Sequence, residues 1–327
     1  MKREFLAIFF LVTITLISCQ KESKTNEPIR LQGSVFGTTY SIIYYDVTTN
    51  FDANIQQLFA DVNQSLSTYI PTSDISRINR GEKGIKVDDY YREVFSKSAR
   101  IFKETDGYFD PTVGNLVNAW GFGPKKPLNE LDSTKVNELM QYVGFDKVKI
   151  ENGEVVKESQ EIYFDFNAVA KGFGIDVIAR FLESQKVTNY LVEIGGEIRT
   201  HGTKPEGKDW VVQLDSPNTD GTRTAYDVLT LKNKSMASSG NYRKFRIAEN
   251  GEKYVHTINP KTGYARESNL LAATVYADLD CADVDAYATA FMAMGLEKTK
   301  EFLEDRKDLQ VVLIYVDNEG NITEYRK

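Results

Sequence analysis

Apolar residues recur along this chain at helical spacing in several separate stretches. Ile55, Leu58, Phe59, Val62 and Leu66 follow one face of a 3.6-residue period, so the pattern predicts a helix over Asp52–Thr68. The same reasoning predicts further helices over Tyr90–Thr105, Ser133–Val143, Gly172–Ser184, Ala282–Met294 and Glu297–Asp305. Ser133 is expected to cap the third of these helices.

Between the helices lie short runs rich in β-branched and aromatic residues. They predict strands within Leu31–Tyr45 and at Glu161–Phe164, Tyr190–Ile194, Trp210–Leu214, Tyr226–Leu231, Leu270–Tyr276 and Gln310–Val316. Many of these runs are separated only by turn residues, and no regular βαβ repeat is visible. The pattern therefore predicts an α+β fold with mixed, largely antiparallel sheets and packed helices. The length of the chain after residue 30 suffices for one large domain or two small ones.

The N-terminal pattern differs from the rest of the chain. Lys2 and Arg3 precede the short apolar run Phe5–Ile17, which ends in Leu16-Ile17-Ser18-Cys19. This arrangement is typical of a bacterial lipoprotein signal peptide over residues 1–18. Cys19 is then the lipidated residue and residues 19–30 form a polar tether, so we expect an exported lipoprotein anchored in the cell envelope, facing the periplasmic side. The alternative is an ordinary secretory signal with an incidental cysteine.

Composition narrows the function classes. The chain has 40 basic and 47 acidic residues, a net charge of −7 and no long basic run, which argues against nucleic acid as a partner. Cys281 is the one cysteine beyond Cys19, so the sequence predicts no intrachain disulfide. His and Cys residues do not cluster at ligand spacing, which argues against zinc.

One motif combines small residues with a lysine. Asp165-Phe166-Asn167-Ala168-Val169-Ala170-Lys171-Gly172-Phe173-Gly174-Ile175-Asp176 lies between the predicted strand ending at Phe164 and the predicted helix. Such a turn lets a ligand approach the backbone, and a helix start offers N–H groups to an anion. Lys171 adds positive charge, so the motif is a candidate phosphate site. The alternative is a tight turn with a surface lysine.

A second motif pairs hard oxygen ligands on a predicted helix. Asp285 and Thr289 are four residues apart, so their side chains share one face. Mg²⁺ prefers such oxygens and takes few of them from protein. The alternative is an acidic first turn, with Thr289 bonded back to the backbone.

Two further regions are candidates on weaker grounds. His256 precedes the turn Asn259-Pro260-Lys261-Thr262-Gly263 and has the chemistry of a general base, although a lone histidine is often structural. Phe109–Gly114 and Trp120–Gly123 are rich in glycine and aromatic residues. They suit either a flat ring ligand or core packing.

Taken together, these motifs resemble the ApbE family, the FAD:protein FMN transferases, over about Gly33 to Gly295. The matching landmarks are Phe36–Tyr40, Ser67–Tyr69 with Ser73 and Asn79, Gly107–Thr112, Trp120–Gly123, Asp165–Asp176, Val192–Gly196, Ser239-Gly240, His256–Gly263 and Asp285–Thr289. Their order matches the family throughout. Phe36 stands where the family often has a methionine.

The resemblance implies roles for particular residues. Mg²⁺ would be bound by the side chains of Asp285 and Thr289 and by the carbonyl of Ala168, and His256 and Asp285 would be catalytic. The residues implied to contact FAD, the substrate, are Phe36, Tyr69, Ala119, Trp120, Gly121, Asp165, Lys171 and Ile258.

The resemblance also implies an activity. A Thr or Ser hydroxyl of an exported or membrane redox protein would attack the FMN phosphorus of FAD, giving a phosphoester and AMP. The same residues would serve a Mg²⁺-dependent FAD pyrophosphatase, in which water replaces the hydroxyl. A non-catalytic FAD-binding lipoprotein is a third possibility. A solute-binding lipoprotein is disfavoured because its two-lobed βαβ pattern is missing.

Overall fold

The computed structural model describes residues 27–128, 131–218, 222, 224–241, 245–247, 253–265 and 268–327. The predicted signal peptide, Cys19 and residues 19–26 of the predicted tether lie outside the described residues. Within the described ranges, no helix is long and apolar enough to span a membrane.

The helices lie close to the predicted ranges. They are α1 (Asp52–Leu66), α2 (Asp74–Asn79), α3 (Asp89–Glu104), α4 (Gly114–Ala119), α5 (Ser133–Met140), α6 (Asn167–Ser184), α7 (Cys281–Met294) and α8 (Leu296–Glu304), with short 3₁₀ segments at Phe145–Lys147 and Pro205–Gly207.

The strands are β1 (Ile29–Val35), β2 (Thr38–Tyr44), β3 (Val148–Glu151), β4 (Glu154–Lys157), β5 (Tyr190–Ile194), β6 (Glu197–His201), β7 (Trp210–Asp215), β8 (Ala225–Leu231), β9 (Ser235–Gly240), β10 (Phe245–Ile247), β11 (Lys253–Val255), β12 (Leu270–Ala277), β13 (Gln310–Val316) and β14 (Ile322–Arg326).

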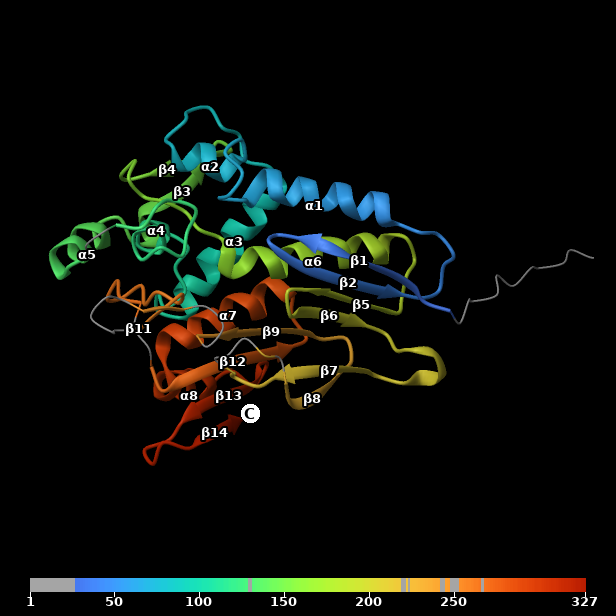
Figure 1. Cartoon of the computed structure of the whole chain (residues 1–327). Coiled ribbons are helices and arrows are strands. Elements are labelled where there is room, and N and C mark those ends of the chain that lie inside the picture. Colours follow the sequence, from blue (N-terminus) through green and yellow to red (C-terminus); the bar gives the residue numbers. More distant parts are fainter. Residues whose placement is uncertain are drawn as a thin grey trace, which may run out of the picture.

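An antiparallel sheet of eight strands organises the molecule (Figure 1). Its order is β1-β2-β5-β6-β9-β12-β13-β14, and every neighbouring pair is antiparallel. Three two-stranded ribbons, β3–β4, β7–β8 and β10–β11, complete the described strands. The predicted α+β class with largely antiparallel sheets is confirmed.

Two helices cover one face of this sheet, and a hairpin covers part of the other. α6 packs on β5 and β6, and α7 packs on β9 and β12. α1 and α3 lie outside them and form a further layer (Figure 1). Apolar side chains of β7 and β8, including Leu214 and Leu231, are buried with those of the central strands on the opposite face. α6 and α7 therefore lie between the sheet and the outer helices α1 and α3.

The sequence of α7 explains this enclosure. Nearly every side chain from Cys281 to Ala293 is buried, and most are small or apolar. A helix that is apolar all round is stable only when it is surrounded by protein. Asp285 is carried on this helix, so its carboxylate is buried as well, at 3% exposure.

Backbone contact joins α6 to α7. A Cβ placed on Gly172 would lie 2.4 Å from the carbonyl oxygen of Cys281, so only glycine permits this approach. One turn further along α6, the carboxylate of Asp176 accepts hydrogen bonds from the N–H groups of Cys281 and Ala282, at 2.8 and 2.9 Å. These amides begin α7 and have no partner within the helix. Asp176 thus caps α7 from a neighbouring helix.

The predicted strand Glu161–Phe164 is wrong. The segment is irregular, and Tyr163 makes only an isolated bridge to Val113. The side chain of Asn79 replaces a neighbouring strand, because it donates to the Phe164 carbonyl at 2.9 Å and accepts from the Phe164 N–H at 2.8 Å. A side chain 85 residues away in sequence therefore satisfies this backbone, which periodicity does not reveal.

Two local predictions also need correction. α6 begins at Asn167 rather than Gly172, so the glycines lie inside the helix and serve close packing instead of a strand-to-helix turn. Asp132, not Ser133, caps α5 by accepting from the Lys135 N–H, and that helix ends at Met140.

We predict that Gly172→Ala destabilises the protein by about 1–3 kcal/mol, the range for overpacking a tight site. The added methyl group would force α6 and α7 apart. Urea unfolding followed by circular dichroism measures the loss. Ser184→Ala, at an exposed position on the same helix, is the control and should change stability by less than about 0.5 kcal/mol. Equal stability of the two variants would contradict the close contact.

Candidate functional site

A cavity of about 900 Å³ opens where α6, α7 and the ends of several strands meet. Its volume is at the upper end of the range for small-molecule sites, which is about 300–1,000 Å³. Predicted site residues on its wall are Phe36, Tyr69, Asp165, Ala168, Lys171, His256, Ile258, Asp285 and Thr289. Phe36 and Thr289, more than 250 positions apart in the sequence, thus share one cavity.

Oxygen ligands gather where α6 meets α7. Asp285 Oδ2 accepts from the Gly172 N–H at 3.1 Å. This N–H is the usual helical partner of the Ala168 carbonyl, which has a second lone pair for another partner. The Thr289 hydroxyl, one turn beyond Asp285, lies 3.2 Å from the Ser239 hydroxyl on β9. The backbone contact at Gly172 brings these groups together.

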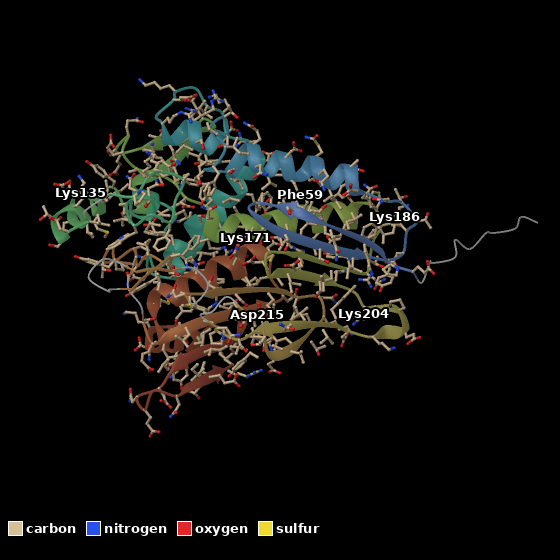
Figure 2. The ribbon with its side chains drawn as sticks, viewed as in Figure 1. Phe59, Lys135, Lys171, Lys186, Lys204 and Asp215 are labelled. Atoms are coloured by element: carbon tan, nitrogen blue, oxygen red, sulfur yellow. The ribbon has the colours of Figure 1, made fainter. Side chains whose placement is uncertain are left out.

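A lysine lies between two carboxylates at the same place. Lys171 Nζ is 2.7 Å from Glu197 Oε1 and 4.0 Å from Asp285 Oδ1. Lys171, labelled in Figure 2, lies near the middle of the molecule on α6. Glu197 begins β6 and is only 4% exposed, and its second oxygen, Oε2, is buried with no hydrogen-bond partner among the described residues.

Burial and neighbouring charges together set the pKa values of Glu197, Asp285 and Lys171. Burial raises the pKa of Glu197 to about 7, although the Lys171 ammonium opposes the rise. Burial also raises the pKa of Asp285, against the effects of Lys171 and of the Gly172 N–H. For Lys171 burial alone would lower the pKa, but the two carboxylates outweigh it and raise the pKa above its ordinary value. The lysine therefore stays charged at neutral pH.

Aromatic and acidic side chains form other parts of the wall. Tyr69 is 56% exposed, which is unusual for a large ring. Phe36 has a left-handed backbone, with φ of 51°, at the β1–β2 turn. Its ring lies over Gly174 of α6, where a Cβ would be 2.6 Å from it. Asp165 accepts from the Asn167 N–H at 2.8 Å, at the start of α6. A flat ligand could contact both rings.

The segment Ala119-Trp120-Gly121 does not line the cavity. Ala119 and Trp120 are buried, and Trp120 Nε1 donates to the Gly263 carbonyl at 2.8 Å. Its ring packs with Phe122 and Ile258, which do reach the cavity. The structure thus places Trp120 behind the wall, and direct flavin contact by this segment stays a prediction.

The residues present fit Mg²⁺. They offer one carboxylate, one hydroxyl and one backbone carbonyl, and Mg²⁺ typically takes few protein oxygens and fills its octahedron with water and phosphate. Among the described residues, no group of three or more His, Cys, Asp and Glu side chains could hold a metal. A metal that needs a closed cage of such ligands would therefore fit less well.

Glu197 is absent from the sequence-based candidates, and Ser239 enters them only as part of the family landmark Ser239-Gly240. Glu197 follows Gly195 and Gly196, which form the turn between β5 and β6. Their φ values are 64° and 105°, in the region that favours glycine. That turn sets the register in which Glu197 faces α6. Alternation along β6 could have suggested an inward carboxylate, but its lysine partner depends on tertiary packing.

The comparisons with known proteins identify the family. The sequence pattern of the ApbE family matches residues 36–313. The chain belongs to the ApbE family. The resemblance drawn from the motifs alone is thereby confirmed, and the family match includes every predicted site residue except Cys19.

Curated relatives are similar over nearly their whole length. The Haemophilus influenzae protein named FAD:protein FMN transferase is 36% identical over 326 residues, covering 95% of this chain and 92% of that protein. A protein of the same name from Vibrio cholerae is 32% identical, covering 94% and 92%.

Solved structures of ApbE proteins share the fold. The flavin transferase ApbE from Vibrio cholerae superposes with a TM-score of 0.82 at 31% identity, covering 92% of this chain and 97% of that chain. The apo form of the Pseudomonas stutzeri flavinyl transferase ApbE gives a TM-score of 0.80 at 25% identity, covering 92% and 95%.

We predict that Tyr69→Ala weakens FAD binding about 5- to 150-fold, because stacking of a base on an aromatic ring contributes about 1–3 kcal/mol. Fluorescence titration with FAD in the presence of EDTA measures binding without turnover. Tyr69→Phe retains the ring and is the matched control, so its affinity should stay close to that of the unmodified protein. An unchanged affinity in the alanine variant would remove Tyr69 from the flavin site.

Proposed function

We propose that this protein transfers FMN from FAD to a Thr or Ser hydroxyl of an acceptor protein, in a Mg²⁺-dependent reaction that releases AMP. The observation that carries this proposal is the single cavity in which Asp285, Thr289 and Ala168 present oxygens beside Lys171. The names of the curated relatives support the same activity.

The wall residues have separable tasks in this proposal. Asp285, Thr289 and the Ala168 carbonyl would hold Mg²⁺, which supplies charge neutralisation at the phosphates when bound. Lys171 binds the pyrophosphate as a second positive charge. Phe36, Tyr69 and Asp165 hold the FMN half of FAD, and the segment around Ile258 holds another part of the molecule.

The acceptor hydroxyl oxygen then forms a bond to the FMN phosphorus while the bond from that phosphorus to the AMP oxygen breaks. A neutral hydroxyl is a poor nucleophile, so its proton must be removed. His256 lines the same cavity and takes that proton in the proposal. AMP leaves with the bridging oxygen, and FMN stays attached through a phosphoester.

We also propose that the enzyme acts at a membrane. Residues 1–18 would be removed, Cys19 would carry the lipid, residues 19–30 would act as a tether, and residues 31–327 would form the catalytic domain. An anchored enzyme with an open cavity suits exported or membrane redox proteins as acceptors, in the cell envelope on the periplasmic side.

An acceptor assay tests the activity. The protein is incubated with FAD and Mg²⁺, with and without an exported flavoprotein subunit as acceptor, and products are separated by chromatography and mass spectrometry. The proposal expects AMP together with acceptor carrying FMN. AMP with free FMN in both samples would instead identify a FAD pyrophosphatase, and no AMP in either would identify a FAD-binding lipoprotein.

We predict that Asp285→Ala abolishes Mg²⁺-dependent turnover, because the variant lacks the charged ligand. FAD binding in EDTA should persist in part, since the rings make their own contacts. Thr289→Val removes a neutral ligand at similar volume and should cause a smaller loss. Single-turnover assays across a Mg²⁺ titration measure both effects. Full activity of the Asp285 variant at low Mg²⁺ would refute the metal assignment.

We predict that His256→Ala slows FMN transfer by about 10²- to 10⁴-fold, the usual contribution of a general base, with nearly normal FAD binding. The rate of the unmodified enzyme should rise with pH, since only neutral imidazole accepts a proton. The variant should lose this rise. If His256 only shapes the following turn, the variant would lose FAD affinity or thermal stability and keep the pH profile.

We predict that Cys19→Ala yields protein without lipid at its N-terminus, either soluble or with the signal peptide uncleaved, because the acyl chains supply the membrane affinity of the mature protein. Mass spectrometry of the mature N-terminus and fractionation test this. The lipoprotein assignment is wrong if the unmodified mature protein begins well beyond Cys19 and carries no lipid.

A further inference from the structure

Glu197 is a buried carboxylate to which the proposed reaction gives no task. It lines the cavity, is 4% exposed, and has one oxygen, Oε1, paired with Lys171 at 2.7 Å. Its other oxygen has no partner among the described residues. A buried polar atom left without a partner typically costs about one hydrogen bond of stability. Stability alone therefore does not explain a carboxylate at this position.

Its position decides which carboxylate Lys171 pairs with. Within the described part of the chain, Lys171 Nζ lies within 4.0 Å of two carboxylates only, Glu197 at 2.7 Å and Asp285 at 4.0 Å. The ammonium thus forms a close pair with Glu197 and stays beyond hydrogen-bond distance of Asp285. If the charge of Glu197 were missing, Asp285 would be the nearest remaining partner for the lysine.

The backbone holds Glu197 in this place firmly. Glu197 is the first residue of β6, directly after the Gly195-Gly196 turn, and it pairs with Ile194 of β5. Two residues further along β6, Arg199 pairs with Asp176 of α6 at 2.6 Å. Residues at i and i+2 share one face of a strand, so β6 presents an acidic and then a basic side chain to Lys171 and Asp176 of α6. Two ion pairs therefore join β6 to α6: in one the strand supplies the acidic residue, and in the other it supplies the basic residue.

We propose that Glu197 is a positioning residue that holds Lys171 away from Asp285 and so keeps Asp285 open to a divalent cation. This inference rests on the proposed function, specifically on Asp285 as a metal ligand. Without Glu197 the ammonium would pair with Asp285 and compete with the cation for its oxygens. Lys171 would then bind the metal ligand instead of the phosphates.

The proposal makes the effect of Glu197 depend on Lys171. In Glu197→Gln, we expect Mn²⁺ alone to bind about 10- to 100-fold more weakly, the usual loss when an outer partner of a metal site is removed. In Lys171→Met no ammonium competes, so adding Glu197→Gln to that background should change the affinity less than about threefold. Coupling of this size between two residues is the signature of direct interaction.

The experiment is a titration of purified, metal-free protein with Mn²⁺, with the free ion measured by electron paramagnetic resonance at fixed pH. It compares unmodified protein, Glu197→Gln, Lys171→Met, the double variant and Asp285→Ala. Glu193→Gln is the matched control, since Glu193 belongs to the same hairpin and accepts from the Gly196 N–H at 2.7 Å, a bond that the amide oxygen retains. Thermal unfolding of each metal-free variant checks the fold.

The outcomes distinguish a failure of the positioning role of Glu197 from a failure of Asp285 as a metal ligand. A large loss for Glu197→Gln that disappears in the Lys171→Met background supports the positioning role. An equal loss in both backgrounds, or no loss in either, overturns it. If Asp285→Ala binds Mn²⁺ as tightly as unmodified protein, the metal assignment itself fails, whatever the Glu197 variants do. A change in Glu193→Gln equal to that in Glu197→Gln would attribute the effect to the hairpin and also overturn the proposal.

Discussion

The close contact between α6 and α7 is the constraint on which the site depends. Gly172 allows the two backbones to touch at Cys281, and Asp176 holds the first amides of α7. Everything proposed to bind the metal lies on these two helices, with Ala168 on one and Asp285 and Thr289 on the other. A shift of either helix would separate the oxygens that we propose share a single ion, so packing in the core would set the geometry of the chemistry.

Charge balance is the second constraint, and it follows from the first. Enclosing α7 removes Asp285 from water, which raises its pKa and favours the protonated form. Lys171 counters this effect, but a lysine too close to Asp285 would occupy the oxygens that we propose bind a cation. Glu197 resolves the conflict by taking the lysine at 2.7 Å. The arrangement keeps three ionisable groups in a small volume beside the cavity, where we propose that phosphate and metal bind.

The sequence predicted much of this structure because local patterns and a family resemblance both pointed to it. Helical periodicity located α1, α3 and α7 to within two residues, and the motif order identified the ApbE family. Prediction from the sequence failed where contacts with distant residues, rather than the local sequence, determine the structure. Asn79 satisfies the backbone of Phe164, so a strand-like sequence is not a strand. The sequence suggested a turn at Gly172. Glycine is needed there because α6 touches Cys281 of α7, 109 residues later in the chain, and local sequence does not show this contact. The pairing of Lys171 with Glu197 was likewise hidden, because it depends on how β6 is placed against α6.

The central claim is that a divalent cation binds at Asp285, where α6 meets α7, while Glu197 stays paired with Lys171 and keeps it away from Asp285. Anomalous diffraction from a crystal of the protein soaked with Mn²⁺ tests it most directly. The account predicts one strong peak about 2.0–2.3 Å from oxygens of Asp285, Thr289 and Ala168, with the Lys171 ammonium still paired with Glu197. A peak at other residues, or a Lys171 ammonium bonded to Asp285 with no ion beside it, would contradict the account.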